Sequence, residues 1–215
     1  MLLAACSSAR EASSQQQEAR SEQQAARSQN AGSLQISSPS FNQNEVIPAQ
    51  FTCDGAGMSP ALRFSGAPRG ARSLVLIVVD PDVSKSIKPD GRYLHWALWN
   101  LSANRTELIE GQRALGLNDN GPGNYIPPCP PNGEHRYFFQ LYAIDYVIGN
   151  ARISSEADLR RAMEGHILEQ DELVGRYTAQ SFRRTRNVAV TVAVLLALFM
   201  IYRAWPRIGA AIRRR

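Results

Sequence analysis

The chain has 215 residues, which is enough for one domain of ordinary size with a tail at each end. Its formal net charge of +5 is unevenly distributed, because residues 34–178 carry 13 Lys and Arg against 16 Asp and Glu, whereas residues 179–215 carry eight Arg and no acidic residue. A nucleic-acid-binding protein is expected to carry its basic charge on the folded domain, so this distribution argues against nucleic acid as a partner.

Residues 1–33 contain a candidate lipidation signal followed by a polar tether. The run Leu3-Ala4-Ala5-Cys6 resembles a bacterial lipobox, in which Cys6 would receive a lipid. Only five residues precede Cys6 and none is basic, so the alternatives are a truncated secretory signal and a chance match, and the lipobox is slightly favoured. The following residues lack large apolar side chains and cannot bury enough surface to offset their ordering entropy, which predicts a disordered tether.

Short apolar runs separated by Pro and Gly begin at Leu34 and predict a mainly β domain over residues 34–178. Residues 72–80 are rich in β-branched side chains and predict a buried strand. Residues 94–100 and 136–145 predict two more strands, with turn-rich segments between them.

One helix is predicted near the end of this domain. Ser155 followed by Asp158 forms a start that resembles a capping box, and Gly175 suits the position after the last helical residue. Apolar residues recur between them near helical spacing, at Leu159, Met163, Ile167 and Val174. The domain is therefore expected to end in a helix packed on a sheet, with His166 in mid-helix as a packing residue.

Residues 179–215 predict a basic-flanked membrane anchor. Residues 188–202 are apolar except for Thr191 and have arginines on both sides, but a spanning helix needs about 20 residues. Adding Ala204 and Trp205, with Arg203 snorkelling, reaches the lower limit of that length, so an anchor is favoured over a buried terminal helix. If Cys6 is lipidated, the domain lies on the extracytoplasmic side of the membrane; otherwise it could be cytoplasmic on a tail anchor.

Polar side chains that could bind a ligand or take part in a reaction lie at the ends of the three predicted strands. Asp80 and Asp82 close the first strand, His95 opens the second, and His135 opens the third after a proline-rich loop. If these strands are neighbours, two imidazoles and a carboxylate converge on one pocket. Imidazole can donate hydrogen bonds to an anion, and an adjacent Asp would fix its tautomer and raise its pKa.

The segments that carry these residues resemble the phosphatidylethanolamine-binding protein family, in its bacterial Raf-kinase-inhibitor-like branch. The resemblance covers about 145 residues in the family's order. Its most specific motifs are Asp80-Pro-Asp82, His95-Trp96 and Cys129-Pro-Pro-Asn-Gly-Glu-His-Arg-Tyr137.

The resemblance implies a β-sandwich with a surface pocket for phosphate-like anions, such as a phospholipid headgroup or a phosphorylated side chain. By motif position, the implied ligand-binding residues are Asp80, Asp82, His95, Pro130, Pro131, His135 and Tyr137. The family is generally described as binders and as kinase or protease modulators, without an agreed catalytic activity. The resemblance implies no cofactor.

Two departures from the family's bacterial branch concern the pocket walls. The segment from Val83 to Leu94 is longer than usual, and Tyr93 stands where a tryptophan is expected. Residues 126–128, Ile-Pro-Pro, replace a glycine-containing stretch. Cys53 and Cys129 both fall in family motifs, which suggests a disulfide between them in an oxidising compartment.

Three functions are compatible with these residues. The first is a non-catalytic, membrane-tethered module that binds a phosphate-like anion and could modulate a kinase or protease. The second is a hydrolase of a phosphate or ester, with His95 or His135 as base and Asp80 orienting it, and with Cys129 as the only candidate nucleophile. The third is a metal site of His95, His135 and Asp80, although the cysteine spacing matches no zinc motif. The sequence favours the first.

Overall fold

The structure is a computed structural model that describes residues 33–114, 116–149 and 152–180. The candidate lipidation residue Cys6, the polar tether up to residue 32 and the apolar segment 188–202 lie outside these described residues. Within the described ranges, no helix is long and apolar enough to cross a membrane.

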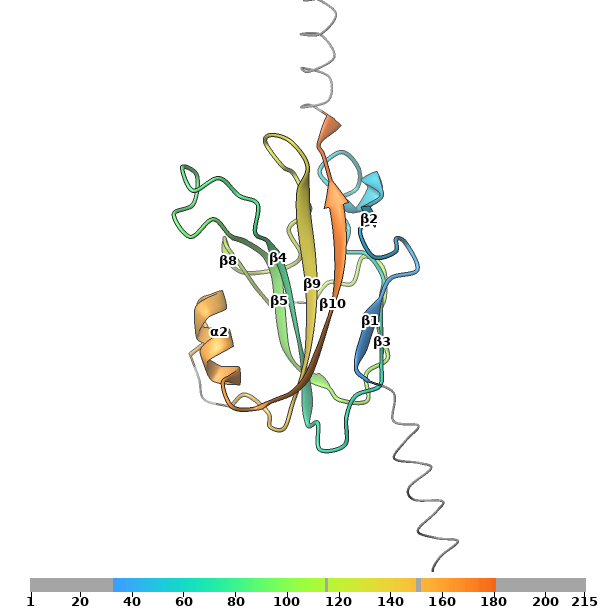
Figure 1. The fold of residues 1–215 in the computed structure, drawn as a ribbon, viewed down its shortest axis with the longest axis vertical. Helices are drawn as coiled ribbons and strands as arrows, with labels where there is room; N and C mark the ends of the chain where they lie inside the picture. Colours follow the sequence, from blue (N-terminus) through green and yellow to red (C-terminus); the bar gives the residue numbers. More distant parts are fainter. Residues whose placement is uncertain (1–32, 115, 150–151, 181–215) are drawn as a thin grey trace, which may run out of the picture.

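The described chain forms two β-sheets and one α-helix, so the prediction of a mainly β fold is confirmed (Figure 1). The smaller sheet has the order β1 (Gln35–Ser37), β3 (Leu62–Ser65) and β6 (Glu107–Leu108). The larger sheet has the order β2 (Glu45–Val46), β10 (Ile167–Tyr177), β9 (His135–Ile144), β4 (Ser73–Asp80), β5 (Tyr93–Ser102), β7 (Gly116–Asn118) and β8 (Gly121–Gly123). The remaining elements are a short 3-10 helix, η1 (Ala49–Phe51), and the helix α2 (Glu156–Met163).

The core lies on both faces of β4, whose eight residues are all buried. Because side chains alternate along a strand, Leu74, Leu76 and Val78 join the cluster that includes residues of the small sheet, whereas Val75, Ile77 and Val79 join the cluster that includes α2. The small sheet therefore covers one face of the large sheet and α2 covers the other, as Figure 1 shows. Burial on both faces explains why β4 reads as an uninterrupted apolar run.

Strand direction brings the predicted polar residues to one edge of the large sheet. β4 lies between β5 and β9 and is antiparallel to both. The end of β4 therefore meets the beginnings of β5 and β9, with Asp80 opposite Tyr93 and Val79 opposite Phe138. Asp80, His95 and His135 consequently share one edge.

The prediction of a long terminal helix is wrong, because α2 ends at Met163 and the chain then forms the strand β10. Ser155 does cap α2, since its side chain accepts a hydrogen bond from the Asp158 amide. After a turn with Gly165 at φ +77°, β10 pairs with β9 from Ile167 to Tyr177. The apolar spacing at Ile167 and Val174 fitted a helix by coincidence, and long-range strand pairing decided the structure.

His166 is likewise not a mid-helix packing residue. It lies in the turn between α2 and β10, and its side chain is 46% exposed. Its Nδ1 lies 2.8 Å from Asp145 Oδ1, and the Tyr146 ring packs against the imidazole. The side chain therefore forms a surface pair that closes the turn.

Gly175 is a buried strand residue rather than the end of a helix. A Cβ added there would lie 2.5 Å from Ile47 Cγ1 and 2.9 Å from Phe41 Cε2, so β10 needs glycine to pack closely at this point. We expect Gly175→Ala to lower the free energy of unfolding by about 1–3 kcal/mol through overpacking, measured by urea denaturation. Gly149→Ala is the matched control, because a Cβ at Gly149 meets no atom of the described residues within 4 Å. Equal stability of the two variants would contradict this account.

Candidate functional site

A cavity of about 260 Å³ lies at the edge where β4 ends and β5 and β9 begin. Its walls come from these strands, from the loop after β4 and from the proline-rich loop before β9. The lining residues are Asp80, Val83, Ile87, Tyr93, His95, Ile126, Pro127, Cys129, Pro130, Pro131, His135 and Tyr137. Six of the seven residues expected in the pocket are therefore brought together, and Asp82 is not among them.

Asp80 and His135 form a buried pair in this cavity, with exposures of only 3% and 4%. His135 Nδ1 lies 2.7 Å from Asp80 Oδ2, and the other carboxylate oxygen accepts a hydrogen bond of 2.8 Å from the Asp82 amide. Because a carboxylate accepts, it fixes the proton on His135 Nδ1 and directs Nε2 to other partners. Nε2 has one long contact, 3.4 Å to Asn132 Oδ1.

His95 is held by the backbone of Ile126 rather than by a carboxylate. The Ile126 amide donates to the His95 carbonyl at 3.0 Å, and the Ile126 carbonyl lies 2.7 Å from His95 Nδ1. The rings of Tyr93 and Tyr137 flank the imidazole, with centroids 5.0 and 5.2 Å away. Burial lowers the pKa of His95 and outweighs the raising effects of the Ile126 carbonyl and of Asp80. Asp80 therefore acts to raise the pKa of His95, as expected of a nearby carboxylate, but burial decides the net direction.

The hydroxyl of Tyr137 is the one polar group of the cavity wall that is buried without a partner among the described residues. Burial is also the main reason that the pKa of this phenol is raised, so Tyr137 keeps its proton at neutral pH. A buried hydroxyl without a hydrogen bond is destabilising, which makes its retention here a pointer to a missing acceptor.

The proline-rich wall is anchored by a disulfide. Cys53 and Cys129 are joined with an S–S distance of 2.10 Å, and the Cys53 amide donates to the Pro128 carbonyl at 3.0 Å. The bond ties the loop that carries Pro130 and Pro131 to the segment after η1. It also removes Cys129 as a thiol nucleophile in this structure.

Asp82 is placed outside the cavity lining, contrary to expectation. Its carboxylate accepts from the Arg136 guanidinium at 2.7 and 2.9 Å and from the Arg136 amide at 2.9 Å. The hydrogen bond from the Arg136 side chain is the main cause that lowers the pKa of Asp82. Asp82 therefore ties the end of β4 to β9, and it positions the site from outside.

Both segments that depart from the family pattern line the cavity. Val83 and Ile87 from the longer loop line the cavity, and Ile87 is 59% exposed. Tyr93 lies beside His95, and residues 126–127 also line the cavity. Sequence reasoning named these segments as altered but did not identify Val83, Ile87 or Ile126 as wall residues. The sequence gives no indication that Ile126 belongs to the site. Its role depends on its backbone carbonyl, which only the tertiary packing directs at His95.

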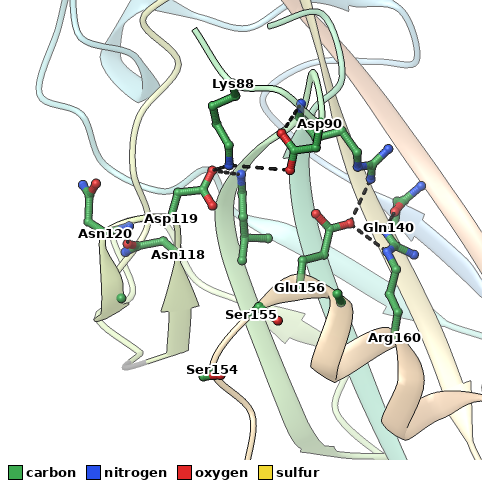
Figure 2. A pocket seen from close by; sticks show the side chains of 14 residues that line it. Lys88, Asp90, Asn118, Asp119, Asn120, Gln140, Ser154, Ser155, Glu156 and Arg160 are labelled. Atoms are coloured by element: carbon green, nitrogen blue, oxygen red, sulfur yellow. Dashed lines mark hydrogen bonds and ion pairs between the residues drawn. The ribbon is translucent and has the colours of Figure 1, made fainter. Parts of the chain in front are cut away.

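A second cavity of about 870 Å³ lies between the loop before β5, the β7–β8 turn and α2 (Figure 2). Its charged groups are paired with one another. Lys88 pairs with Asp119, and Arg92 and Arg160 both pair with Glu156, at 2.9 and 2.7 Å. Figure 2 shows these contacts as dashed lines between side chains that line the cavity. These groups hold the loop, the sheet and α2 together, so the smaller cavity with its unpartnered Tyr137 hydroxyl is the better candidate for a ligand site.

The metal alternative finds no support in the arrangement of these groups. Across the ranges that the structure describes, no cluster of three or more His, Cys, Asp or Glu side chains could hold a metal ion. His95 Nδ1 is directed at a carbonyl and His135 Nδ1 at Asp80, so the two imidazoles do not converge on a shared point with these nitrogens.

The two sheets, the helix α2 and the cavity at the strand edge, all within the described ranges, are those of a fold of the phosphatidylethanolamine-binding-protein type. The sequence profile of the phosphatidylethanolamine-binding protein family matches residues 37–178, and the chain belongs to this family. The suspected family resemblance is therefore confirmed.

Individual relatives agree with this assignment. A UPF0098 protein of Chlamydia pneumoniae is 47% identical over 147 residues, which cover 67% of this chain and 98% of the relative. A crystal structure of a phosphatidylethanolamine-binding protein homologue from Chlamydia trachomatis is 43% identical with a TM-score of 0.65, covering 68% of this chain and 98% of that one. The structure of YbcL of Escherichia coli, at 24% identity with a TM-score of 0.61, shares the fold and covers 69% and 99% of the two chains.

Proposed function

We propose that the domain is a non-catalytic binding module for a phosphate-like anion or a phospholipid headgroup. The observation that carries this proposal is the unpartnered Tyr137 hydroxyl on a cavity that also contains His95 and the Asp80–His135 pair. An anionic oxygen would accept the hydrogen bond that this phenol cannot make within the described chain. The family's name supports the same class of ligand.

The cavity favours an anion through hydrogen bonds rather than through net charge. Asp80 would offset the charge of a doubly protonated His135 ring, so the pair brings no net positive charge in either state of the ring. The Tyr137 hydroxyl is a donor for a ligand, and the long contact of His135 Nε2 with Asn132 is readily exchanged. Hydrogen bonds to an ionised acceptor are stronger than neutral ones, and a buried cavity strengthens them further.

Tyr137→Phe tests this proposal directly. The substitution removes a hydroxyl and keeps the buried ring, so we expect affinity for phosphate or O-phosphoethanolamine, measured by calorimetry, to fall about tenfold or more. The free protein should be as stable as the wild type or more stable, because one unsatisfied buried group is lost.

Tyr125→Phe is the matched control. The Tyr125 hydroxyl donates to the Phe51 carbonyl at 3.3 Å and the residue does not line the cavity. This variant should lose up to about 1 kcal/mol of stability and keep its affinity. If Tyr137→Phe binds phosphate as tightly as the wild type does, the proposed site is wrong.

A hydrolase is the alternative, favoured by the Asp80–His135 pair, which has the form of an oriented general base. With Cys129 in a disulfide, the nucleophile would have to be water. Turnover of p-nitrophenyl phosphate or p-nitrophenyl acetate that is lost in His135→Ala would establish this alternative. Binding without turnover favours the non-catalytic module.

Membrane attachment is a further part of the proposal. It rests on the sequence of Cys6 and of residues 188–202, and on the arginines that flank the latter. A lipid on Cys6 would place the domain outside the cytoplasmic membrane, where the Cys53–Cys129 disulfide would persist. Mass spectrometry of the mature N-terminus tests the lipid. Extraction from membranes by alkaline carbonate would contradict an integral anchor. A kinase or protease partner is proposed from the family alone.

A further inference from the structure

The hydrogen-bonding role of His95 is fixed by its backbone partner. A carbonyl oxygen can only accept, so the Ile126 carbonyl at 2.7 Å requires a proton on His95 Nδ1. In a neutral imidazole Nε2 then has no proton and acts as an acceptor. No hydrogen bond to Nε2 is present within the described part of the chain, so this acceptor is available to a ligand on the cavity wall.

Burial favours the neutral form of the His95 ring in the free protein, and the surrounding charged groups act in both directions. Asp80 at the end of β4 and Asp119 after β7 favour the imidazolium, whereas His135 on β9 and burial oppose it. Burial is the largest of these influences and lowers the pKa of His95. The Tyr93 ring is tilted against the imidazole and the Tyr137 ring packs edge to face with it, and neither phenol is charged at neutral pH.

The wall of the cavity therefore offers both a donor and an acceptor. Tyr137 donates, and His95 Nε2 accepts. A fully deprotonated oxyanion has only acceptors and would place a lone pair against the lone pair of Nε2, which leaves a buried acceptor unsatisfied. An oxyanion with one hydroxyl satisfies both groups, because its hydroxyl donates to His95 Nε2 and another of its oxygens accepts from Tyr137.

We propose that the cavity selects an oxyanion that carries one proton, with a phosphate monoester as the ligand class and its P–OH group donating to His95 Nε2. This inference rests on the proposed anion-binding function and specifies the ligand and its protonation state. A phosphate diester such as a phospholipid headgroup has no P–OH group, so the inference separates the two sources of phosphate.

Methyl phosphate and methyl sulfate provide the test. At pH 5 both are tetrahedral monoanions of similar size, and only methyl phosphate carries a hydroxyl. Calorimetry with the folded protein at pH 5 should show methyl phosphate binding about tenfold or more tightly than methyl sulfate. Glycerophosphoethanolamine, a diester with the lipid headgroup, should also bind at least about tenfold more weakly than methyl phosphate.

The pH dependence gives a second readout. The second pKa of a phosphate monoester is about 6, and the bound state retains the proton. The affinity should therefore be highest below pH 6 and fall by up to about tenfold per pH unit above it, with uptake of up to one proton at pH 7.5. Proton uptake is measured from the binding enthalpy in buffers of different ionisation enthalpy. His166→Ala, which removes an exposed imidazole away from the cavity, should leave this profile unchanged.

Failure of the proposed selection for a protonated monoester can be distinguished from failure of the proposed anion binding. If methyl sulfate or glycerophosphoethanolamine binds as tightly as methyl phosphate at pH 5, or if the affinity for methyl phosphate does not change between pH 5 and 8, selection of a protonated monoester is wrong while anion binding stands. If none of the three compounds binds, the proposed function fails as well.

Discussion

Asp80→Asn is expected to lower the free energy of unfolding by about 1–3 kcal/mol and to weaken phosphate binding about tenfold or more. The two Asp80 carboxylate oxygens each accept one hydrogen bond, from His135 Nδ1 and from the Asp82 amide. An asparagine has only one carbonyl oxygen, so either one buried donor loses its acceptor or the His135 ring changes tautomer. In both cases the arrangement of Nε2 toward the cavity is no longer fixed. Urea denaturation and calorimetry measure the two effects.

The chain contains a matched control for this prediction. Asp145 and His166 make a similar contact, 2.8 Å between carboxylate and Nδ1, but their side chains are 45% and 46% exposed. Water can replace either partner there, so Asp145→Asn should change stability by less than about 1 kcal/mol and leave binding unchanged. Equal effects of the two substitutions would show that burial of the Asp80–His135 pair does not matter.

Loss of the Cys53–Cys129 disulfide is expected to lower stability by about 4 kcal/mol, because the bond closes a loop of 76 residues in the unfolded chain. The double variant Cys53→Ser, Cys129→Ser should show this loss in urea, and the wild type should approach it when a reductant is added. Cys129 also lines the cavity, so both treatments should weaken phosphate binding by releasing the proline-rich wall.

Two comparisons isolate the bond. The double variant should not respond to reductant, and Cys6→Ser should behave like the wild type under both conditions. If reductant leaves the denaturation midpoint of the wild type unchanged, the disulfide does not contribute as described.

The central strands and most of the cavity could be predicted from the sequence because their signals are local. An apolar run such as residues 73–80 indicates burial on both faces, and polar residues at its end must lie near the beginnings of antiparallel neighbours. The sequence predicted that Asp80, His95 and His135 meet if the three strands are neighbours, and the order β9, β4, β5 meets this condition. Motif resemblance added Tyr137 and the two prolines, which also line the cavity.

The terminal strand could not be predicted in the same way. Residues 167–177 satisfy a helical spacing of apolar side chains, but β10 is stabilised by partners far away in sequence. Glu169 and Asp171 accept hydrogen bonds from the amides of Leu34 and Ile36, 135 residues earlier in each case. Local periodicity contains no information about such pairing, so tertiary contacts overrode it.

The sequence by itself determined the mainly β class, the family, and six of the residues that meet at the strand edge. Only the tertiary structure decided that Asp82 faces Arg136 outside the cavity, that the Ile126 carbonyl fixes the proton on His95, and that Tyr137 is left with a hydroxyl to donate. The reason is that side-chain alternation and the position of polar residues at strand ends follow from the local sequence, whereas a hydrogen bond depends on which donor and acceptor the packed chain brings within about 3 Å.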